Sequence, residues 1–137
     1  MKELNVEAKI DNLHRVLEFV DEELEGLDCS IKLQTQIDVA VEELFVNIAS
    51  YAYEGGNGMA CIRIDKEEME PAIVITFIDQ GFPYNPLERE DPDVTLSVEQ
   101  RNIGGLGVFM VKKSMDEVSY KYCDGSNMLT IKKKLAG

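Results

Sequence analysis

The sequence is poor in the side chains that build metal centres and nucleophilic active sites. It has one histidine, His14, and three cysteines at positions 29, 61 and 123. The cysteines are odd in number and widely scattered, and no CxxC, HExxH or Cys/His pairing occurs. This argues against a structural zinc site. It also argues against a thiolate or histidine-triad enzyme, because nearly all the residues that such a site needs are missing. We interpret the cysteines as reduced thiols of a cytoplasmic protein.

Basic residues are also scarce. The chain has 14 Lys and Arg against 26 Asp and Glu, a formal net charge of −12. Nucleic-acid binding needs clustered Lys and Arg to displace counterions, so we expect no direct contact with DNA or RNA. An anionic ligand such as a nucleotide phosphate would instead need backbone N–H groups, a helix N-terminus and a divalent cation.

Long apolar runs are missing too. The longest, VITFI and VFMV, fall far short of the roughly 20 residues that span a bilayer. The first residues, MKELNVEAKID, lack the apolar segment of a signal peptide. We therefore expect a soluble protein without membrane contact. A chain of 137 residues with 45% hydrophobic side chains can bury a core of its own, so we expect one domain over residues 1–137.

The hydrophobic pattern predicts alternating strands and helices. We expect strands over 3–9, 59–65 and 72–79, helices over 13–27 and 31–52 with N-caps at Asp11 and Ser30, and two final strands around the DGSN turn at 124–127. A third helix is expected from Val108, Met110, Val111, Met115 and Val118. This order predicts an α+β fold: a two-layer α/β sandwich with helices on one face of a mixed, mostly antiparallel sheet.

Residues 82–103 hold three of the four prolines, many charges and little periodicity. A segment of this length inside a small domain is usually functional. We interpret it as a lid over a binding site.

Three short segments carry candidate chemistry, the first in VEELFVNIASYAY. Glu43, Asn47 and Tyr51 are spaced by four residues and share one helical face. An amide oxygen is a suitable Mg²⁺ ligand, and a carboxylate one turn away can act as a general base. On spacing alone, a solvated helix edge is the simpler interpretation.

The second segment is VITFIDQGFPYNP, where Asp79 ends an apolar strand and Gly81 follows. Polar residues at strand ends beside glycine are common in binding sites. A carboxylate here can accept a hydrogen bond from the exocyclic amine of adenine but would meet the O6 acceptor of guanine. The alternative is an ordinary turn residue, since DxG is a common sequence.

The third segment is the run RNIGGLGVFMVKK, in which Gly104, Gly105 and Gly107 precede a helix. Glycines let backbone N–H groups face a cavity, and the helix behind them offers its positive end to phosphate oxygens. A tight loop-to-helix connection is the alternative. The run matches neither GxxxxGK[ST] nor GxGxxG.

Taken together, the three segments resemble in order and spacing the N, G1 and G2 boxes of the GHKL ATPases, the superfamily of gyrase B, a heat-shock chaperone and the histidine kinases. The short chain, the run RNIGGLGVFMVKKSMDEVSY and the terminal GSNMLTIKKKL resemble more narrowly the anti-sigma factor serine kinases. Members of that group sequester a sigma factor or phosphorylate a serine on its antagonist.

The resemblance implies the Bergerat ATP-binding fold, ATP and Mg²⁺ as cofactors, and residues 82–103 as the ATP lid. It implies an ATP-dependent protein serine/threonine kinase in transcription regulation, with a STAS-type anti-sigma factor antagonist, a sigma factor or both as partners, and a homodimer as a candidate assembly. The implied site residues are the base Glu43, the Mg²⁺ and nucleotide ligand Asn47, the adenine-binding Asp79 with Gly81, and, for the phosphates, Gly104, Gly105, Leu106 and Gly107 with Arg101 as a candidate.

The sequence departs from the family pattern at several positions. Tyr51 stands where histidine is frequent, and Pro83 replaces the second glycine of the G1 box. Asn127 and Met128 stand where a threonine is common, and Arg101 lies farther upstream than the arginine that precedes the family's G2 glycines. Lys112 and Lys113 are interpreted as an exposed helix flank rather than as ligands.

Two other functional classes share this pocket. One is a nucleotide-dependent binding module that docks a partner without transferring phosphate. The other is the catalytic domain of a histidine kinase, which we do not favour because the sequence shows no dimerisation domain or membrane anchor. We expect His14 on the surface of its helix rather than in a phosphotransfer site.

Overall fold

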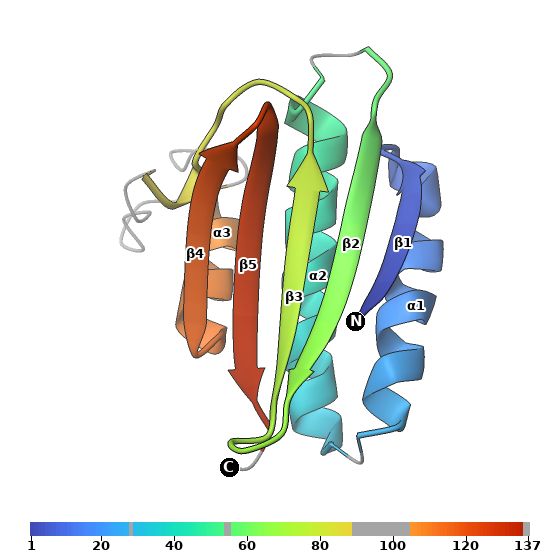
Figure 1. Ribbon diagram of the computed structural model, residues 1–137, viewed down its shortest axis with the longest axis vertical. Coiled ribbons are helices and arrows are strands. Elements are labelled where there is room, and N and C mark those ends of the chain that lie inside the picture. Colours follow the sequence, from blue (N-terminus) through green and yellow to red (C-terminus); the bar gives the residue numbers. More distant parts are fainter. Residues whose placement is uncertain (28, 54–55, 89–104, 136–137) are drawn as a thin grey trace.

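One five-stranded sheet and the helices that cover one of its faces make up the fold (Figure 1). The computed structural model describes residues 1–27, 29–53, 56–88 and 105–135. The strands are β1 (Lys2–Glu7), β2 (Met59–Glu67), β3 (Ala72–Asp79), β4 (Glu117–Cys123) and β5 (Ser126–Lys134). The helices are α1 (Leu13–Glu25), α2 (Ile31–Tyr51) and α3 (Gly105–Ser114), with the short 3₁₀ helices η1 (Ile10–Asn12) and η2 (Pro86–Glu88).

The strand order in the sheet is β1-β2-β3-β5-β4. All four neighbouring pairs are antiparallel, so the predicted two-layer α+β fold is confirmed, while the described strands contain no parallel pair of the expected mixed kind. The β2–β3 hairpin was predicted, but the pairing of β3 with β5 brings together strands that are distant in sequence. Its register places Asp79 opposite Asn127.

The hydrophobic core lies between the sheet and the three helices (Figure 1). Alternate strand residues point to this side because successive side chains of a strand face opposite ways. On β3 these are Ile75 and Phe77, which are almost fully buried beneath Phe45 of α2 and its neighbours. The same alternation continues to Asp79, so the last inward position of β3 is a carboxylate at the edge of the core.

The predicted helix starts are correct for α2 but not for α1. The Ser30 side chain accepts a hydrogen bond from the Leu33 backbone N–H at 3.2 Å, as an N-cap should. Asp11, the predicted cap of α1, lies within η1 instead, and Asn12 occupies the cap position without a side-chain cap bond. The Asn12 side chain donates to the Glu7 carbonyl oxygen at 2.9 Å, which competes with capping.

The predicted third helix is shifted toward its glycines. Helix α3 begins at Gly105 and ends at Ser114, and Val118 belongs to β4 rather than to the helix. The reason is tertiary: β4 pairs with β5 from Glu117 onward, so the chain must leave the helix before that residue. Met110, expected in the core, is 49% exposed. As a result, Gly105 and Gly107 lie in the first turn of α3.

A tight turn fixes the register of the last hairpin. Asp124 and Gly125 have positive φ angles of 52° and 80°, as a two-residue type I′ turn requires. This confirms the predicted turn and sets which residues of β5 face the helices. Asn127, Leu129 and Ile131 are the inward set.

No helix of the described residues is both long enough and apolar enough to span a membrane.

Candidate functional site

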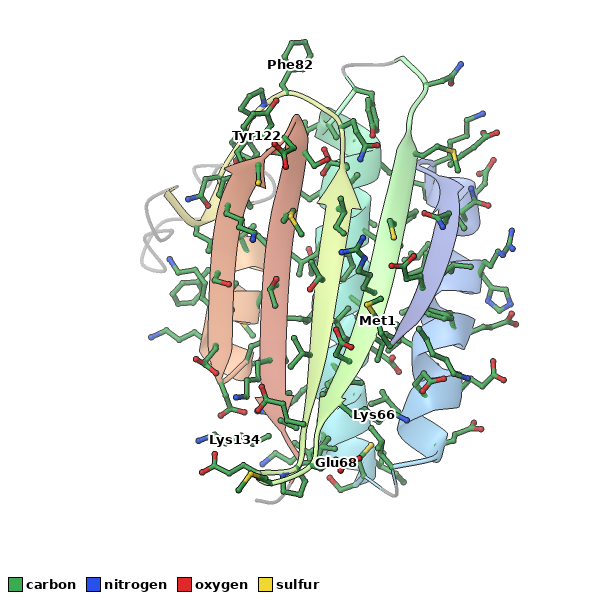
Figure 2. The ribbon with its side chains drawn as sticks, viewed as in Figure 1. Met1, Lys66, Glu68, Phe82, Tyr122 and Lys134 are labelled. Carbon is green, nitrogen blue, oxygen red and sulfur yellow. The ribbon has the colours of Figure 1, made fainter. Side chains whose placement is uncertain are left out.

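A cavity of about 360 Å³ lies between the C-terminal part of α2, the end of β3 and the β4–β5 hairpin. Its walls are mostly apolar and aromatic, with a few polar groups, which is the usual character of a small-molecule site. Phe82 belongs to its lining and is 58% exposed. Phe82 and Glu68 lie at opposite ends of the sheet (Figure 2). The lining residues are Leu44, Asn47, Ile48, Ser50, Tyr51, Ala52, Phe77, Asp79, Phe82, Pro83, Tyr84, Pro86, Tyr120, Asn127 and Leu129.

Asp79 is the buried acidic group of this cavity, with only 5% of its surface exposed. Its Oδ1 accepts hydrogen bonds from the Gly81 backbone N–H at 2.9 Å and from Asn127 Nδ2 at 3.0 Å. Among the described residues, both hydrogen bonds of this carboxylate fall on Oδ1. Its second oxygen, Oδ2, is therefore the one left to accept a hydrogen bond from a ligand.

Gly81 allows the segment after β3 to approach the end of α2. A Cβ atom at this position would lie 2.1 Å from the backbone oxygen of Ala52, so no larger residue fits without a backbone shift. The next residue, Phe82, donates its N–H to the same oxygen at 3.1 Å. The glycine predicted from the DxG pattern is thus required by a close backbone contact.

Tyr53, two residues after the end of α2, joins the start of β2 to the segment that follows β3. Its hydroxyl donates to the Met59 carbonyl oxygen at 2.6 Å and accepts from the Gln80 backbone N–H at 2.9 Å. Burial raises the pKa of Tyr53, so the hydroxyl keeps its proton for the bond to Met59. The segment that follows Asp79 is therefore held at Gln80 and Phe82 to the two residues that follow α2.

The predicted pair on α2 faces two neighbouring parts of the structure. Asn47 is half-buried and lines the cavity. Glu43, one turn earlier, is also half-buried, and its carboxylate lies against Gly107: a Cβ atom there would be 2.0 Å from Glu43 Oε2. Tyr51, one turn after Asn47, lines the cavity and is 50% exposed. The three residues thus lie on one face of α2, as their spacing predicted, and their functional roles stay predictions.

The glycine run is described in part. Gly105 and Gly107 lie in the first turn of α3, which packs beside α2. Leu106 also belongs to this turn, but its side chain, like Gly104, Arg101 and residues 89–103 of the predicted lid, lies outside the described residues. The structure therefore places the positive end of α3 next to Glu43 and leaves the predicted roles of Gly104 and Arg101 as predictions.

Several lining residues were not predicted from the sequence. Tyr84 and Tyr120 contribute aromatic surface, and Asn127 contributes a buried polar group. The sequence does contain an indication that Asn127 is special: it is a polar residue at the same alternating positions as the apolar Leu129 and Ile131, which face the core. Its pairing with Asp79, however, depends on a strand pairing that no local pattern reveals.

Of the residues interpreted as surface groups, His14 and Lys113 are exposed, whereas Lys112 is half-buried. The His14 side chain is 84% exposed and lies 2.8 Å from Glu18 on the same helix. Lys113 is exposed and lies over the ring of Phe109 at 5.5 Å from its centroid, as an ordinary helix-surface contact.

The sequence model of the histidine kinase-like ATPase domain family matches residues 6–133. The chain belongs to this family. The matched range includes Glu43, Asn47, Asp79 and the glycine run, and the family's description as an ATPase domain implies that the chain uses ATP.

Two relatives of this histidine kinase-like ATPase domain carry kinase names. The serine/threonine-protein kinase BtrW of Bordetella bronchiseptica is 26% identical over 102 residues, which are 74% of this chain and 71% of that protein. The serine-protein kinase RsbW of Staphylococcus aureus is 32% identical over 85 residues, which are 59% of this chain and 54% of that protein. The chain thus spans about half the length of the Staphylococcus kinase.

Solved structures support the fold. The RsbU and RsbW domains of Rv1364c from Mycobacterium tuberculosis match 98% of this chain and 33% of that chain, with a TM-score of 0.63 and 15% identity. The histidine kinase domain of a blue-light activated histidine kinase from Erythrobacter litoralis matches 76% of this chain and 45% of that chain, with a TM-score of 0.56 and 16% identity.

Proposed function

We propose that this chain is an ATP-dependent protein serine kinase that acts as an anti-sigma regulatory factor. Its substrate would be a serine of a STAS-type anti-sigma factor antagonist, and it would sequester a sigma factor in addition or instead. The observation that carries the proposal is the shared cavity of Asn47 and Asp79, with Glu43 one helical turn away against Gly107. The kinase names of two relatives support the choice of a serine as acceptor.

The cavity fits an adenine base at its buried end. Phe77, Ile48 and Leu129 supply apolar surface, and Asp79 Oδ2 supplies one hydrogen-bond acceptor. The 6-amino group of adenine can donate to that oxygen, whereas the O6 of guanine would face it without a proton between them. A buried carboxylate with one free oxygen therefore selects adenine over guanine.

The helix face fits a magnesium ion that is held mainly by phosphates. Among the described residues, no group of three or more His, Cys, Asp or Glu could hold a metal ion. Mg²⁺ commonly binds nucleotide phosphates, waters and only one or two protein oxygens, so Asn47 alone suffices as the protein ligand. When bound, the ion would neutralise charge on the phosphate oxygens.

The residues of the chain then have separate roles in the transfer. The serine Oγ of the partner attacks the γ-phosphorus of ATP, the bond from that phosphorus to the β,γ-bridging oxygen breaks, and ADP leaves. Glu43 accepts the proton of the serine hydroxyl. The N-terminal turn of α3, with Gly105 and Gly107, would offer backbone N–H groups and the positive end of the helix dipole to the phosphates. This arrangement would let a chain of net charge −12 hold a triphosphate.

The test uses partner proteins captured on the immobilised chain from a lysate, with and without Mg-ATP, followed by mass spectrometry of phosphoserine. We expect a captured STAS-type protein to gain one phosphoserine. The Glu43→Gln variant should lose this phosphorylation, while Glu42→Gln, an exposed control on the same helix, should keep it. Capture of the partner without phosphoserine would favour the nucleotide-dependent binding module. Retained phosphorylation by Glu43→Gln would contradict the role of Glu43.

A further inference from the structure

Asn127 occupies a position that ordinarily holds an apolar side chain. It lies on the inward face of β5, in phase with Leu129 and Ile131, and only 7% of its surface is exposed. A buried amide is unfavourable unless its donors and acceptors are paired. Its partners therefore indicate what this residue does.

The amide nitrogen of Asn127 binds three oxygens of the neighbouring segment. Nδ2 donates to Asp79 Oδ1 at 3.0 Å, to the Phe82 carbonyl oxygen at 2.8 Å and to the Gly81 carbonyl oxygen at 3.3 Å. Two hydrogens are thus shared among three acceptors. All three belong to the strand end and turn that form the base end of the cavity.

The amide oxygen of Asn127 binds two donors on opposite sides. Oδ1 accepts from the Tyr84 backbone N–H at 3.1 Å and from the Tyr120 hydroxyl on β4. The orientation of the amide is fixed by these partners, because the Tyr84 N–H can only donate and the Phe82 carbonyl can only accept. One side chain on β5 therefore fastens residues 79–84 to the hairpin.

A threonine cannot replace this set of bonds. Its hydroxyl has one proton to donate and sits on a shorter side chain, whereas Asn127 donates two protons and accepts two bonds. This chain thus fixes the end of its cavity through the amide group of Asn127. Residues 80 and 82 are also bonded to the two residues that follow α2, so the segment is held from both layers.

We infer that Asn127 is the positioning residue for base selection: it holds Asp79 through Oδ1 and so leaves Oδ2 as the single acceptor for the 6-amino group of a purine. This inference rests on the proposed nucleotide site and adds a residue to it. The amide nitrogen and oxygen of Asn127 already form hydrogen bonds within the protein. Asn127 therefore acts through Asp79 rather than by contacting the base.

The experiment measures dissociation constants of Mg-ATP and Mg-ITP by calorimetry. Inosine carries O6 and an N1–H donor where adenine carries the 6-amino group and an N1 acceptor, and it lacks the 2-amino group of guanine. The ratio of the ITP and ATP dissociation constants therefore reports how the site reads the base edge that Asp79 would contact. For the unmutated chain we expect ATP to bind about ten- to a hundredfold more tightly, the effect of one hydrogen bond to a charged group. Asn127→Leu and Asn127→Thr should reduce that ratio to about threefold or less.

Two further variants keep the test decisive. Tyr120→Phe removes one bond to the Asn127 oxygen without changing the size of the cavity wall, and it should lower the ratio by a smaller factor. Thr130→Val, on β5 like Asn127, removes a side-chain hydrogen bond to Thr76 of β3 that does not involve Asp79, and it should leave the ratio unchanged.

The outcomes separate the two proposals. A folded Asn127→Thr variant that keeps the full ratio of ITP to ATP dissociation constants would overturn the positioning role. A variant that binds ATP and ITP more weakly by the same factor would overturn it too, because a residue with only a structural role would have that effect. Equal affinity of the unmutated chain for ATP and ITP would overturn base selection by Asp79, and no binding of either nucleotide would overturn the nucleotide site itself. Should Asn127→Leu not fold, the Thr and Tyr120→Phe variants still decide the matter.

Discussion

The Glu43 carboxylate and the Gly107 backbone lie against each other, so that a Cβ at Gly107 would stand 2.0 Å from Glu43 Oε2. Two segments separated by more than sixty positions in the sequence meet in this contact, the N-box face of α2 and the first turn of α3. The proposed base is thereby held beside the proposed phosphate-binding turn. Phosphoryl transfer depends largely on how the protein positions the base and the phosphates relative to each other, since positioning supplies much of the rate enhancement.

The Gly107→Ala variant tests this contact. The added methyl group must push the Glu43 carboxylate aside, and displacement of a catalytic group by about 1 Å can cost about a hundredfold in rate. We expect the turnover number for serine phosphorylation to fall by about that factor, and by more than ATP affinity falls. Ser114→Ala, at the other end of α3, is the control and should retain activity. Unchanged turnover in Gly107→Ala would show that Glu43 is not held in place by this contact.

Gly81→Ala tests the close contact at the end of β3. Because the new Cβ would lie 2.1 Å from a backbone oxygen, the segment after Asp79 must move. We expect the free energy of unfolding to fall by about 1 to 3 kcal/mol, as in other overpacked sites. Gly26→Ala is the matched control, since its Cβ would meet only the Glu23 backbone oxygen at an ordinary 3.6 Å. Chemical denaturation measures both, and equal stability of the two variants would refute the packing argument.

The paired carboxyl groups of α1 and α2 predict a dependence of stability on pH. Burial, a hydrogen bond with Asp21 and the charge of Asp21 raise the pKa of Asp38 to about 7. In the unfolded chain this carboxyl releases its proton near its ordinary pKa of 3.8, whereas the folded chain retains the proton up to about pH 7. The unfolded state therefore binds fewer protons in this window, and stability falls as pH rises through it.

Asp38→Asn isolates this effect, because the amide does not titrate. Asp38 is partly exposed, so solvent screening reduces the effect. We expect the free energy of unfolding of the variant, relative to that of the unmutated chain, to be about 1 kcal/mol higher at about pH 8 than at about pH 5. Glu42→Gln, exposed on the same helix, should show no such change. Urea unfolding at the two pH values gives the comparison. A difference between Asp38→Asn and the unmutated chain that does not vary with pH would contradict the raised pKa of Asp38.

A buried carboxylate links the N-terminal strand to the core. Glu23 of α1, 8% exposed, lies 3.1 Å from Lys2 of β1 and 3.1 Å from Lys66 of β2. Burial alone would raise the pKa of Glu23, but hydrogen bonds and charges from Lys66 and Lys2 outweigh it and lower the pKa. The stabilisation is therefore present above the ordinary pKa and is lost as pH falls.

Glu23→Gln should cost about 1 to 2 kcal/mol of unfolding free energy at neutral pH, because both lysines lose a charged acceptor while remaining partly solvated. Glu22→Gln, exposed one residue earlier, should change stability by less than about 0.5 kcal/mol. Equilibrium denaturation at low salt measures the pair. A Glu23→Gln variant as stable as Glu22→Gln would show that the three-residue network contributes nothing.

Much of the fold follows from local patterns. The apolar run in VITFID, the helical spacing around Ala40, Leu44 and Ile48, and the DG turn each specify one element, and each element occurs in the structure. The end of α3 did not follow, because the pairing of β4 with β5, not the apolar spacing of the helix, decides where the helix must stop.

The site was predictable where its residues share one helix or one turn. Glu43 and Asn47 lie on one face of α2, and Asp79 with Gly81 lies at one strand end. Asn127 was noted only as a departure from the family pattern. Its bond to Asp79 joins residues 48 positions apart, and that contact exists only after β3 and β5 have paired.

The central claim is that the cavity at Asp79 binds adenine nucleotides through the Asp79 carboxylate. Calorimetric titration of the unmutated chain and of Asp79→Asn with Mg-ATP and Mg-GTP tests it most directly. The account predicts that the unmutated chain binds ATP at least about tenfold more tightly than GTP, and that Asp79→Asn loses most of its ATP affinity while remaining folded. Equal binding of ATP and GTP by the unmutated chain would contradict it.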